Sequence, residues 1–200
     1  MPKPDVTEER TAQIIAAAVN AFARLGFAKT RMDDIATESG LSKGTLYLYF
    51  KSKDEIITAV LNQFFTEELD GIADLLAAPL SAAEKMETLI VQMMADTEVQ
   101  LGQYLSVWLE FYSVAAREGP LRDIMLQYMT QLIDLFTTLI QEGIDNGEFR
   151  AVINARDSAL TISAQFEGLL LLWAIDRESL NLAVATTTAV DLLLRGLRMN

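Results

Sequence analysis

A short basic and aromatic segment, GLSKGTLYLYFKSK at residues 40–53, has the clearest potential for chemistry in this chain. It contains three lysines, two tyrosines and no acidic residue, although the whole chain has a formal net charge of −12. Lysine and tyrosine donate hydrogen bonds to phosphate oxygens, and lysine also donates to the acceptor atoms of guanine. The residue types and the local charge therefore predict a contact with nucleic acid.

The surrounding stretch, DDIATESGLSKGTLYLYF at residues 33–50, has the pattern of a helix-turn-helix. Ala36 lets a second helix approach closely, and Gly40 suits a tight turn at positive φ. Leu41, Leu46 and Phe50 are expected to pack inward, which turns the start of the second helix toward the major groove. The residues predicted to contact DNA are Ser42, Lys43, Gly44, Thr45, Tyr47, Tyr49, Lys51 and Lys53, together with Thr30 and Arg31 from the acid-free stretch RLGFAKTRM.

Helical signals dominate the rest of the chain, which has only 4 prolines and 10 glycines. Two capping boxes, SKDE at 52–55 and SAAE at 81–84, each predict the start of a helix, and Asn154 can cap another. REGP at 117–120 and DNGEF at 145–149 predict helix ends. We expect about nine helices: from Thr7 to Gly26, 32–39, 43–49, 53–77, from 81, two more divided by REGP, 155–175 and 179–198.

The composition excludes several kinds of active site. The chain has no cysteine and no histidine, so Ser-His-Asp and Cys-His nucleophiles and histidine-ligated zinc sites are absent. An all-helical enzyme with a carboxylate-bridged metal remains an alternative, but such sites use Glu-x-x-His pairs. A helical scaffold without DNA contacts is a second alternative, and it leaves the acid-free segment unexplained. The sequence therefore predicts no enzyme activity, no metal site and no cofactor.

Charge divides the chain into two parts. Residues 1–54 contain 8 Lys and Arg against 7 Asp and Glu, whereas the remainder contains 8 against 21. Such asymmetry indicates that the parts have different partners. We predict an all-α fold with a three-helix DNA-binding domain at 1–53 and a larger helical bundle at 54–200.

IATESGLSKGTLYLYFKSKDEI, at residues 35–56, strongly resembles the DNA-binding signature of the TetR family of bacterial transcriptional regulators. The preceding IIAAAVNAFARLGFAKTRMDDIA resembles that family's first helix, so the resemblance covers about residues 8–60. It implies a helical ligand-binding and dimerisation domain, a palindromic operator and a repressor released by a small molecule. Activation remains an alternative direction of regulation. Many relatives carry a polar residue near YLYF where this chain has Leu48 and Tyr49, so base preference does not transfer.

The acidic part contains aromatic residues, methionines and two carboxylates at helical spacing. Such residues usually form a core, but an adaptable, mostly apolar pocket between bundle helices is the functional alternative. A carboxylate among large apolar groups favours a cation, although Arg117, Arg122 or Arg156 could also pair with it. The candidate residues for a hydrophobic or cationic effector are Tyr104, Trp108, Glu110, Phe111, Tyr112, Met125, Tyr128, Met129, Phe166, Glu167, Leu170 and Trp173.

The last two expected helices, within about residues 155–198, are the predicted homodimer interface. Both carry small and aliphatic residues on more than one face, and such helices need covering on more than one side. LTISAQFEGLLLLWAI, at residues 160–175, falls short of the ~20 apolar residues that cross a bilayer, so we expect a buried helix. MPKPDVTEER has no apolar segment typical of a secretory signal. The expectation is a soluble cytoplasmic protein without a membrane partner.

Overall fold

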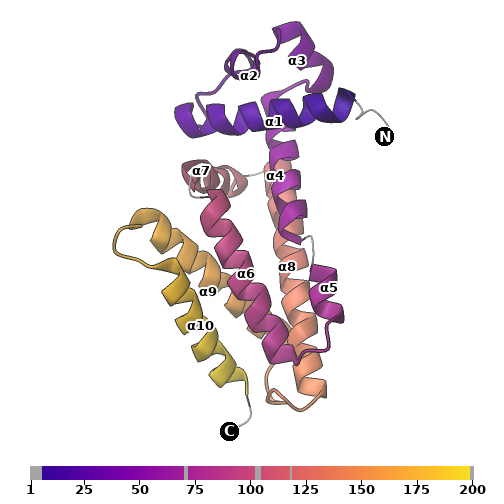
Figure 1. The fold of residues 1–200 in the computed structure, drawn as a ribbon, viewed down its shortest axis with the longest axis vertical. Coiled ribbons are helices and arrows are strands. Elements are labelled where there is room, and N and C mark those ends of the chain that lie inside the picture. Colours follow the sequence, from indigo (N-terminus) through magenta and orange to yellow (C-terminus); the bar gives the residue numbers. More distant parts are fainter. Residues whose placement is uncertain (1–5, 70–71, 102–104, 118, 199–200) are drawn as a thin grey trace. The chain divides into compact units, whose positions relative to one another are not determined.

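The computed structural model describes residues 6–69, 72–101, 105–117 and 119–198. These ranges contain ten α-helices and no strand, which confirms the all-α prediction (Figure 1). The helices are α1 (Val6–Leu25), α2 (Met32–Ser39), α3 (Lys43–Tyr49), α4 (Lys53–Leu69), α5 (Ile72–Ala77), α6 (Ala82–Leu101), α7 (Leu105–Ala115), α8 (Pro120–Asp145), α9 (Ala155–Ile175) and α10 (Leu182–Leu197).

Two helix boundaries differ from the expectation. The single helix expected over 53–77 is divided into α4 and α5, which accounts for the additional helix. The last helix begins at Leu182, three residues later than expected, because the side chain of Asn181 caps it by accepting a hydrogen bond from the Val184 N–H. Asn154 caps α9 in the same way, as predicted.

The chain divides into two compact units that differ from the domains predicted from sequence. Unit 1 comprises residues up to 67 and residues 101–126, and unit 2 comprises 68–100 and 127–200. The predicted boundary between residues 53 and 54 therefore falls inside unit 1. Unit 1 also contains α7 and the first residues of α8, which the sequence had assigned to the larger domain.

Unit 1 contains the helix-turn-helix on a support formed by α1. Ile14 and Phe22 of α1 are fully buried, as are Ile35 of α2 and Leu46 of α3. Gly40 ends α2 at φ 68°, and the Leu41 N–H donates to the Ala36 carbonyl, which closes the turn. The Ser42 hydroxyl then accepts from the Thr45 N–H and starts α3.

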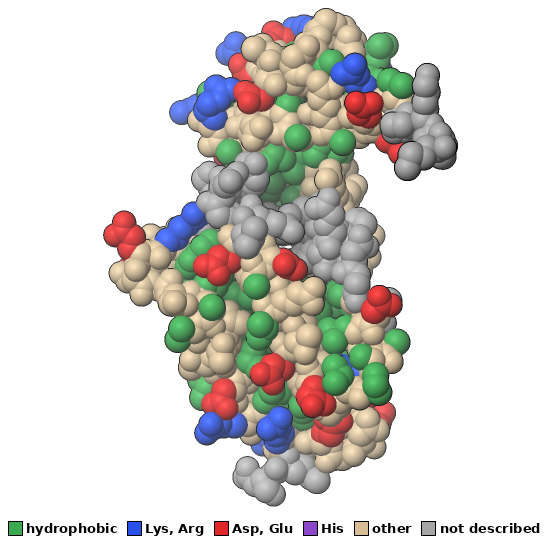
Figure 2. Space-filling model, viewed as in Figure 1, with side chains coloured by type: hydrophobic (Ala, Val, Ile, Leu, Met, Phe, Trp, Pro, Cys, Tyr) green, Lys and Arg blue, Asp and Glu red, His purple; other side chains and the backbone are tan. Residues whose placement is uncertain are grey.

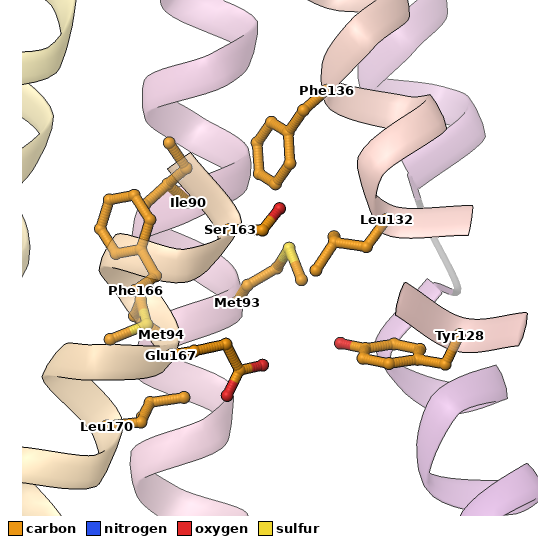
Figure 3. Close-up of a pocket in the computed structure, with 10 residues that line it drawn as sticks. All are labelled: Ile90, Met93, Met94, Tyr128, Leu132, Phe136, Ser163, Phe166, Glu167 and Leu170. Atoms are coloured by element: carbon orange, nitrogen blue, oxygen red, sulfur yellow. The ribbon is translucent and has the colours of Figure 1, made fainter. Parts of the chain in front are cut away.

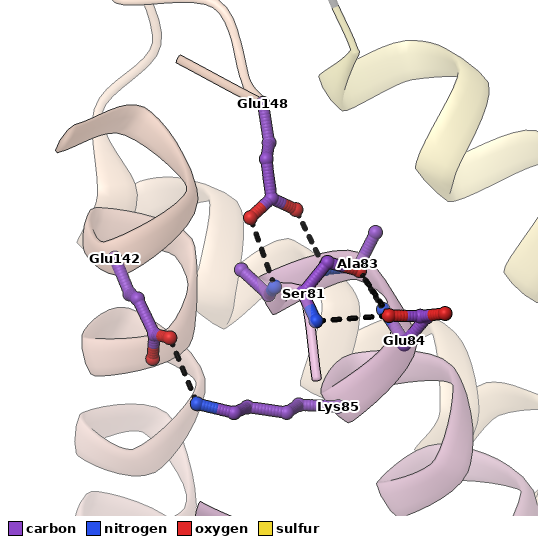
Figure 4. A network of polar contacts seen from close by, with 7 residues as sticks. Ser81, Ala83, Glu84, Lys85, Glu142 and Glu148 are labelled. Atoms are coloured by element: carbon purple, nitrogen blue, oxygen red, sulfur yellow. Dashed lines mark hydrogen bonds and ion pairs between the residues drawn. The ribbon is translucent and has the colours of Figure 1, made fainter. Parts of the chain in front are cut away.

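In unit 2, the start of α6 is held by acidic side chains (Figure 4). Ser81 and Glu84 form the predicted capping box, and the Glu148 carboxylate accepts from the backbone N–H groups of Ala82 and Ala83. The Lys85 ammonium is buried and lies 2.8 Å from the Glu142 carboxylate of α8. These contacts fix α6 against the C-terminal end of α8.

The chain turns sharply after α8, and two glycines, Gly143 and Gly147, make this turn possible. The N–H groups of Glu148 and Phe149 both donate to the Gly143 carbonyl, and Gly147 has a φ of 73°. The ring of Phe149 is buried directly over Gly143, where an added Cβ would lie 2.2 Å from the ring. Only glycine fits at this position without moving the ring.

One face of α9 is not buried within this chain, where the sequence predicts both a buried helix and part of a dimer interface. Ala159, Ile162 and Phe166 face the core, but a second apolar face is exposed, with Ile175 at 75%. By length and composition alone, α9 is long and apolar enough to cross a membrane. Within its most apolar stretch of 18 residues, 22% is buried inside the protein. Helix α10 packs against α9 and also exposes Val184 and Leu192. Figure 2 shows exposed hydrophobic side chains among acidic ones on unit 2.

Candidate nucleic-acid interface and effector cavity

The exposed face of α3 carries most of the predicted DNA contacts. Lys43 and Gly44 are exposed at the start of the helix, Tyr47 is exposed one turn later, and Lys51 follows the end of the helix. The Lys51 ammonium donates to the Tyr47 carbonyl at 2.7 Å, which places its charge beside the tyrosine. Leu48, which the sequence prediction omitted, has 76% of its surface exposed on the same helix. Leu48 follows buried Leu46 by two residues, which places the two side chains on nearly opposite faces of the helix. This spacing could have predicted that Leu48 is exposed.

An acidic residue lies next to this face. The Asp33 carboxylate of α2 is 2.6 Å from the Lys43 ammonium, and both side chains are more than half exposed. The hydrogen bond from Lys43 to Asp33 and the attraction of the two charges raise the pKa of Lys43 above its usual value. Phosphate must therefore compete with Asp33 for the Lys43 ammonium.

Replacing Asp33 by Asn is expected to raise operator affinity about three- to tenfold at low ionic strength. The substitution removes a negative charge that repels phosphate and frees Lys43 to contact DNA. Fluorescence anisotropy with a labelled operator duplex measures the change. Asp54→Asn is the matched control, because Asp54 is also acidic in the first turn of its helix. An equal gain in both variants would assign the effect to net charge and contradict the specific competition.

Two predicted DNA contacts have different surroundings from those expected. Thr30 is only 2% exposed, and its hydroxyl donates to the Gly26 carbonyl at 2.8 Å. The Lys53 ammonium donates to the Phe27 carbonyl at 2.6 Å and lies 4.3 Å from the centre of the Phe27 ring. Both side chains satisfy carbonyls of the loop between α1 and α2. The structure therefore places them in the support of the helix-turn-helix. Arg31, Ser42 and Thr45 reach the surface.

Glu110 of α7 contacts the same loop. Its carboxylate accepts from the backbone N–H of Phe27 and, at 3.3 Å, from that of Ala28. The Phe27 ring packs edge-to-face on Phe22 and on Phe111, the neighbour of Glu110. Gly26 adopts a φ of 81°, which presents these two N–H groups to the carboxylate. Neither an arginine nor a ligand is thus required to explain why Glu110 lies among aromatic residues.

Glu110→Gln is expected to lower the free energy of unfolding by about 1–2 kcal/mol, because the amide keeps one acceptor oxygen and turns a donor toward a donor. Operator affinity should fall with it, since Arg31 follows the loop. Urea unfolding and an operator titration measure the two effects. Glu87→Gln, at an exposed position of α6, is the control and should change stability by less than about 0.5 kcal/mol. An unchanged urea midpoint for Glu110→Gln contradicts the assignment.

Unit 2 contains a small cavity between α6, α8 and α9 (Figure 3). Its volume is about 40 Å³. The lining residues are Ile90, Met93, Met94, Tyr128, Leu132, Phe136, Ser163, Phe166, Glu167 and Leu170. Glu167 is the charged member of this set, and its carboxylate lies on the side toward which the Tyr128 hydroxyl points. The cavity is thus aromatic and apolar, with an acidic group at one side.

The cavity combines four of the predicted effector residues with six that the prediction omitted. The predicted residues are Tyr128, Phe166, Glu167 and Leu170. The prediction includes no residue of α6, although Met93 and Met94 are methionines of the kind that indicated a pocket in the later helices. Glu110, Phe111, Tyr112 and Met125 belong to unit 1. Met129 is exposed, and Trp173 is buried beneath the Arg177 guanidinium, 4.7 Å from the ring centre. Tyr104 and the side chain of Trp108 lie outside the described residues.

Two family models match the chain. The model described as bacterial regulatory proteins of the tetR family matches residues 14–60, which contain the helix-turn-helix. The model of the C-terminal part of BetI-type transcriptional repressors matches residues 82–198. The Bacillus subtilis regulator YfiR, named as an uncharacterised helix-turn-helix transcriptional regulator, is 32% identical over 158 residues. The match covers 74% of each chain.

Solved structures share the fold. A choline-bound protein from Saccharomonospora viridis is 23% identical, with a TM-score of 0.84 over 96% of this chain and 100% of that one. FadR from Bacillus subtilis, in complex with stearoyl-CoA, is 22% identical, with a TM-score of 0.81 over 94% of this chain and 99% of that one. The exposed helix-turn-helix and the all-helical second part are the regions that the two family models match. The chain belongs to the TetR family of bacterial regulatory proteins and is a DNA-binding transcriptional repressor.

Proposed function

We propose that this repressor is a homodimer that binds a palindromic operator and leaves it when a small organic cation enters the cavity of unit 2. The exposed face of α3 is the observation that supports DNA binding. It presents Lys43 and Gly44 at the start of a helix, where helix-turn-helix proteins contact bases, and Tyr47 one turn further along. We assign DNA binding to residues 1–53 and effector binding and dimerisation to residues 54–200. Since its partner is chromosomal DNA, we place the protein in the cytoplasm.

The dimer interface is assigned to α9 and α10, within residues 155–198. One helix-turn-helix reads only a half-site, and a two-fold dimer doubles the contacts across a palindrome. The two helices expose large aliphatic side chains that a partner subunit would bury: Leu160, Leu171, Leu172, Ile175, Val184 and Leu192. A shallow groove of about 430 Å³ between the helices, next to Leu192, is continuous with this surface. An apolar surface of this kind typically marks an interface.

Leu171→Glu combined with Leu172→Glu is expected to convert the dimer to a monomer and to weaken operator binding at least tenfold. Buried carboxylates without partners oppose association, and a monomer contacts one half-site. Sedimentation equilibrium and an operator titration measure both effects. Met129→Glu, an exposed residue of α8, is the control. If the unaltered protein is a monomer that floats with phospholipid vesicles and the variant does not, the surface binds membrane and the dimer assignment is wrong.

The cavity lining supports a cationic effector. Glu167 provides a negative charge, and Tyr128, Phe136 and Phe166 provide aromatic faces that attract quaternary ammonium groups. The fold is shared with a choline-bound protein and with a stearoyl-CoA-bound protein, so the fold alone does not choose between a cation and an acyl chain. A carboxylate in the lining attracts a cation and is unfavourable to bury against an acyl chain, so it favours the cation.

The small size of the cavity supports release on binding. A cavity of about 40 Å³ holds little more than one or two water molecules, so an organic cation must enlarge it. A ligand that fits only an enlarged cavity shifts the population toward that conformation. If that conformation holds the two α3 helices at an unsuitable spacing, operator affinity falls by the coupling free energy, typically ~1–3 kcal/mol.

Selection of bound duplexes from a random pool, with and without choline and tetramethylammonium, tests the proposal. We expect a palindromic consensus, and we expect binding to weaken when a cation is added. Glu167→Gln should retain the consensus and lose the response to the cation. A consensus without two-fold symmetry would contradict the proposal that a dimer binds a palindromic operator. A palindrome that neither cation affects would leave DNA recognition standing and refute the effector class.

A further inference from the structure

A second cavity in unit 2 lies beside the first. It lies between α6 and α10 and has a volume of about 90 Å³, and its lining includes Val91, Glu98, Leu182 and Thr186. Met94 lines this cavity as well as the one that contains Glu167. The side chain of Met94 is buried, and it therefore forms part of the wall between the two spaces.

Methionine suits a wall that changes shape. Its side chain is unbranched, has three rotatable bonds and changes rotamer at little cost, so it adapts to what lies next to it. If Met94 changes rotamer, the two spaces that it borders can join into one elongated site that runs from Glu167 of α9, past α6, to α10.

The second cavity contains a polar group that the protein does not satisfy. Thr186 is 3% exposed, and its hydroxyl oxygen has no hydrogen-bond partner in the part of the chain that the structure describes. Leaving a buried hydroxyl without a partner is unfavourable, and valine would fill the same volume without that penalty. Thr186 lines this space, which is otherwise mostly apolar, and a ligand group that enters it could supply the missing partner.

We propose that Met94 divides one effector site into two compartments, and that the effector is an elongated organic cation. Its ammonium group lies at Glu167, its chain passes Met94, and a hydroxyl or carbonyl at its far end bonds to Thr186. This inference rests on the proposed effector site of unit 2 and specifies what that site binds.

Calorimetric titration of the full-length protein with two series of ligands tests the inference. One series is alkyltrimethylammonium ions from methyl to decyl, below their critical micelle concentrations, and the other carries a terminal hydroxyl. For the unaltered protein we expect affinity to rise with chain length beyond butyl. At one chain length the terminal hydroxyl should improve affinity at least fivefold.

Two variants assign the effect to residues. Met94→Ala should raise the affinity for octyl and longer chains several-fold relative to its effect on tetramethylammonium, which occupies only the Glu167 compartment. Thr186→Val should remove the advantage of the terminal hydroxyl while plain alkyl chains bind as before, and its melting temperature without ligand should not fall. Loss of plain-chain binding in Thr186→Val would assign Thr186 a structural role and overturn its part of the proposal.

The outcomes separate this inference from the proposed function. If short cations bind and release the operator, but affinity is flat beyond butyl and indifferent to both variants, the effector site stands and the second compartment does not exist. If water alone occupies the second cavity, Thr186→Val changes no affinity in either series. If no member of either series binds, the cationic effector fails and this inference fails with it.

Discussion

Replacing Lys43, Tyr47 and Lys51 together by alanine is expected to lower operator affinity by at least two orders of magnitude. All three side chains lie on or beside the exposed face of α3, and the two lysines account for its positive charge. Each contact to a base or phosphate typically contributes ~1 kcal/mol or more, so three together amount to at least ~3 kcal/mol. Titration of the selected operator at fixed ionic strength measures the loss.

The control for this variant must remove the same charge from a different surface. Arg117→Ala combined with Arg122→Ala removes two positive charges at exposed positions outside both α3 and residues 155–198. We expect this control to bind the operator within about threefold of the unaltered protein, and both variants to keep their circular dichroism. A triple variant that still binds with full affinity would show that α3 is not the DNA-contacting element.

Gly143→Ala is expected to lower the free energy of unfolding by about 2–3 kcal/mol, although alanine is the better helix former. The new Cβ would lie 2.2 Å from the buried Phe149 ring, so the ring must move out of its site. The gain in helix propensity, about 1 kcal/mol, offsets only part of this cost. Urea-induced unfolding followed by circular dichroism measures the change.

A double-mutant cycle identifies the cause. Phe149→Ala alone should cost about 3–5 kcal/mol, since it removes a fully buried ring. Once the ring is absent, Gly143→Ala has nothing to displace and should become neutral or stabilising by up to about 1 kcal/mol. Additive effects of the two substitutions would mean that the glycine is required for another reason, such as the turn that follows α8.

The local features of the fold could be predicted from sequence because their signals are local. Gly40, the two capping boxes and Asn154 act on backbone groups within a few residues of themselves, and the structure confirms the helices that they delimit. The start of α10 was predicted too early because Asn181, which has the same capping chemistry, was overlooked.

The assembly of the site could not be predicted in the same way, because helical spacing shows which residues share a face but not what that face contacts. Glu110 and Glu167 have similar aromatic neighbours in sequence. In the structure Glu110 accepts hydrogen bonds from the loop after α1, whereas Glu167 lines a cavity with α6 and α8. Contacts between residues about eighty positions apart decide the difference, and no local pattern records them.

The Asp33–Lys43 pair also affects how many ions move when DNA binds. Each phosphate that a lysine neutralises releases a condensed counterion, so affinity falls with salt at a slope of about 0.9 per contact. When Lys43 turns to phosphate, Asp33 is left without its ammonium partner and attracts a cation from solution. Net ion release is then smaller than the number of phosphates contacted, and a salt titration would undercount the contacts that this surface makes.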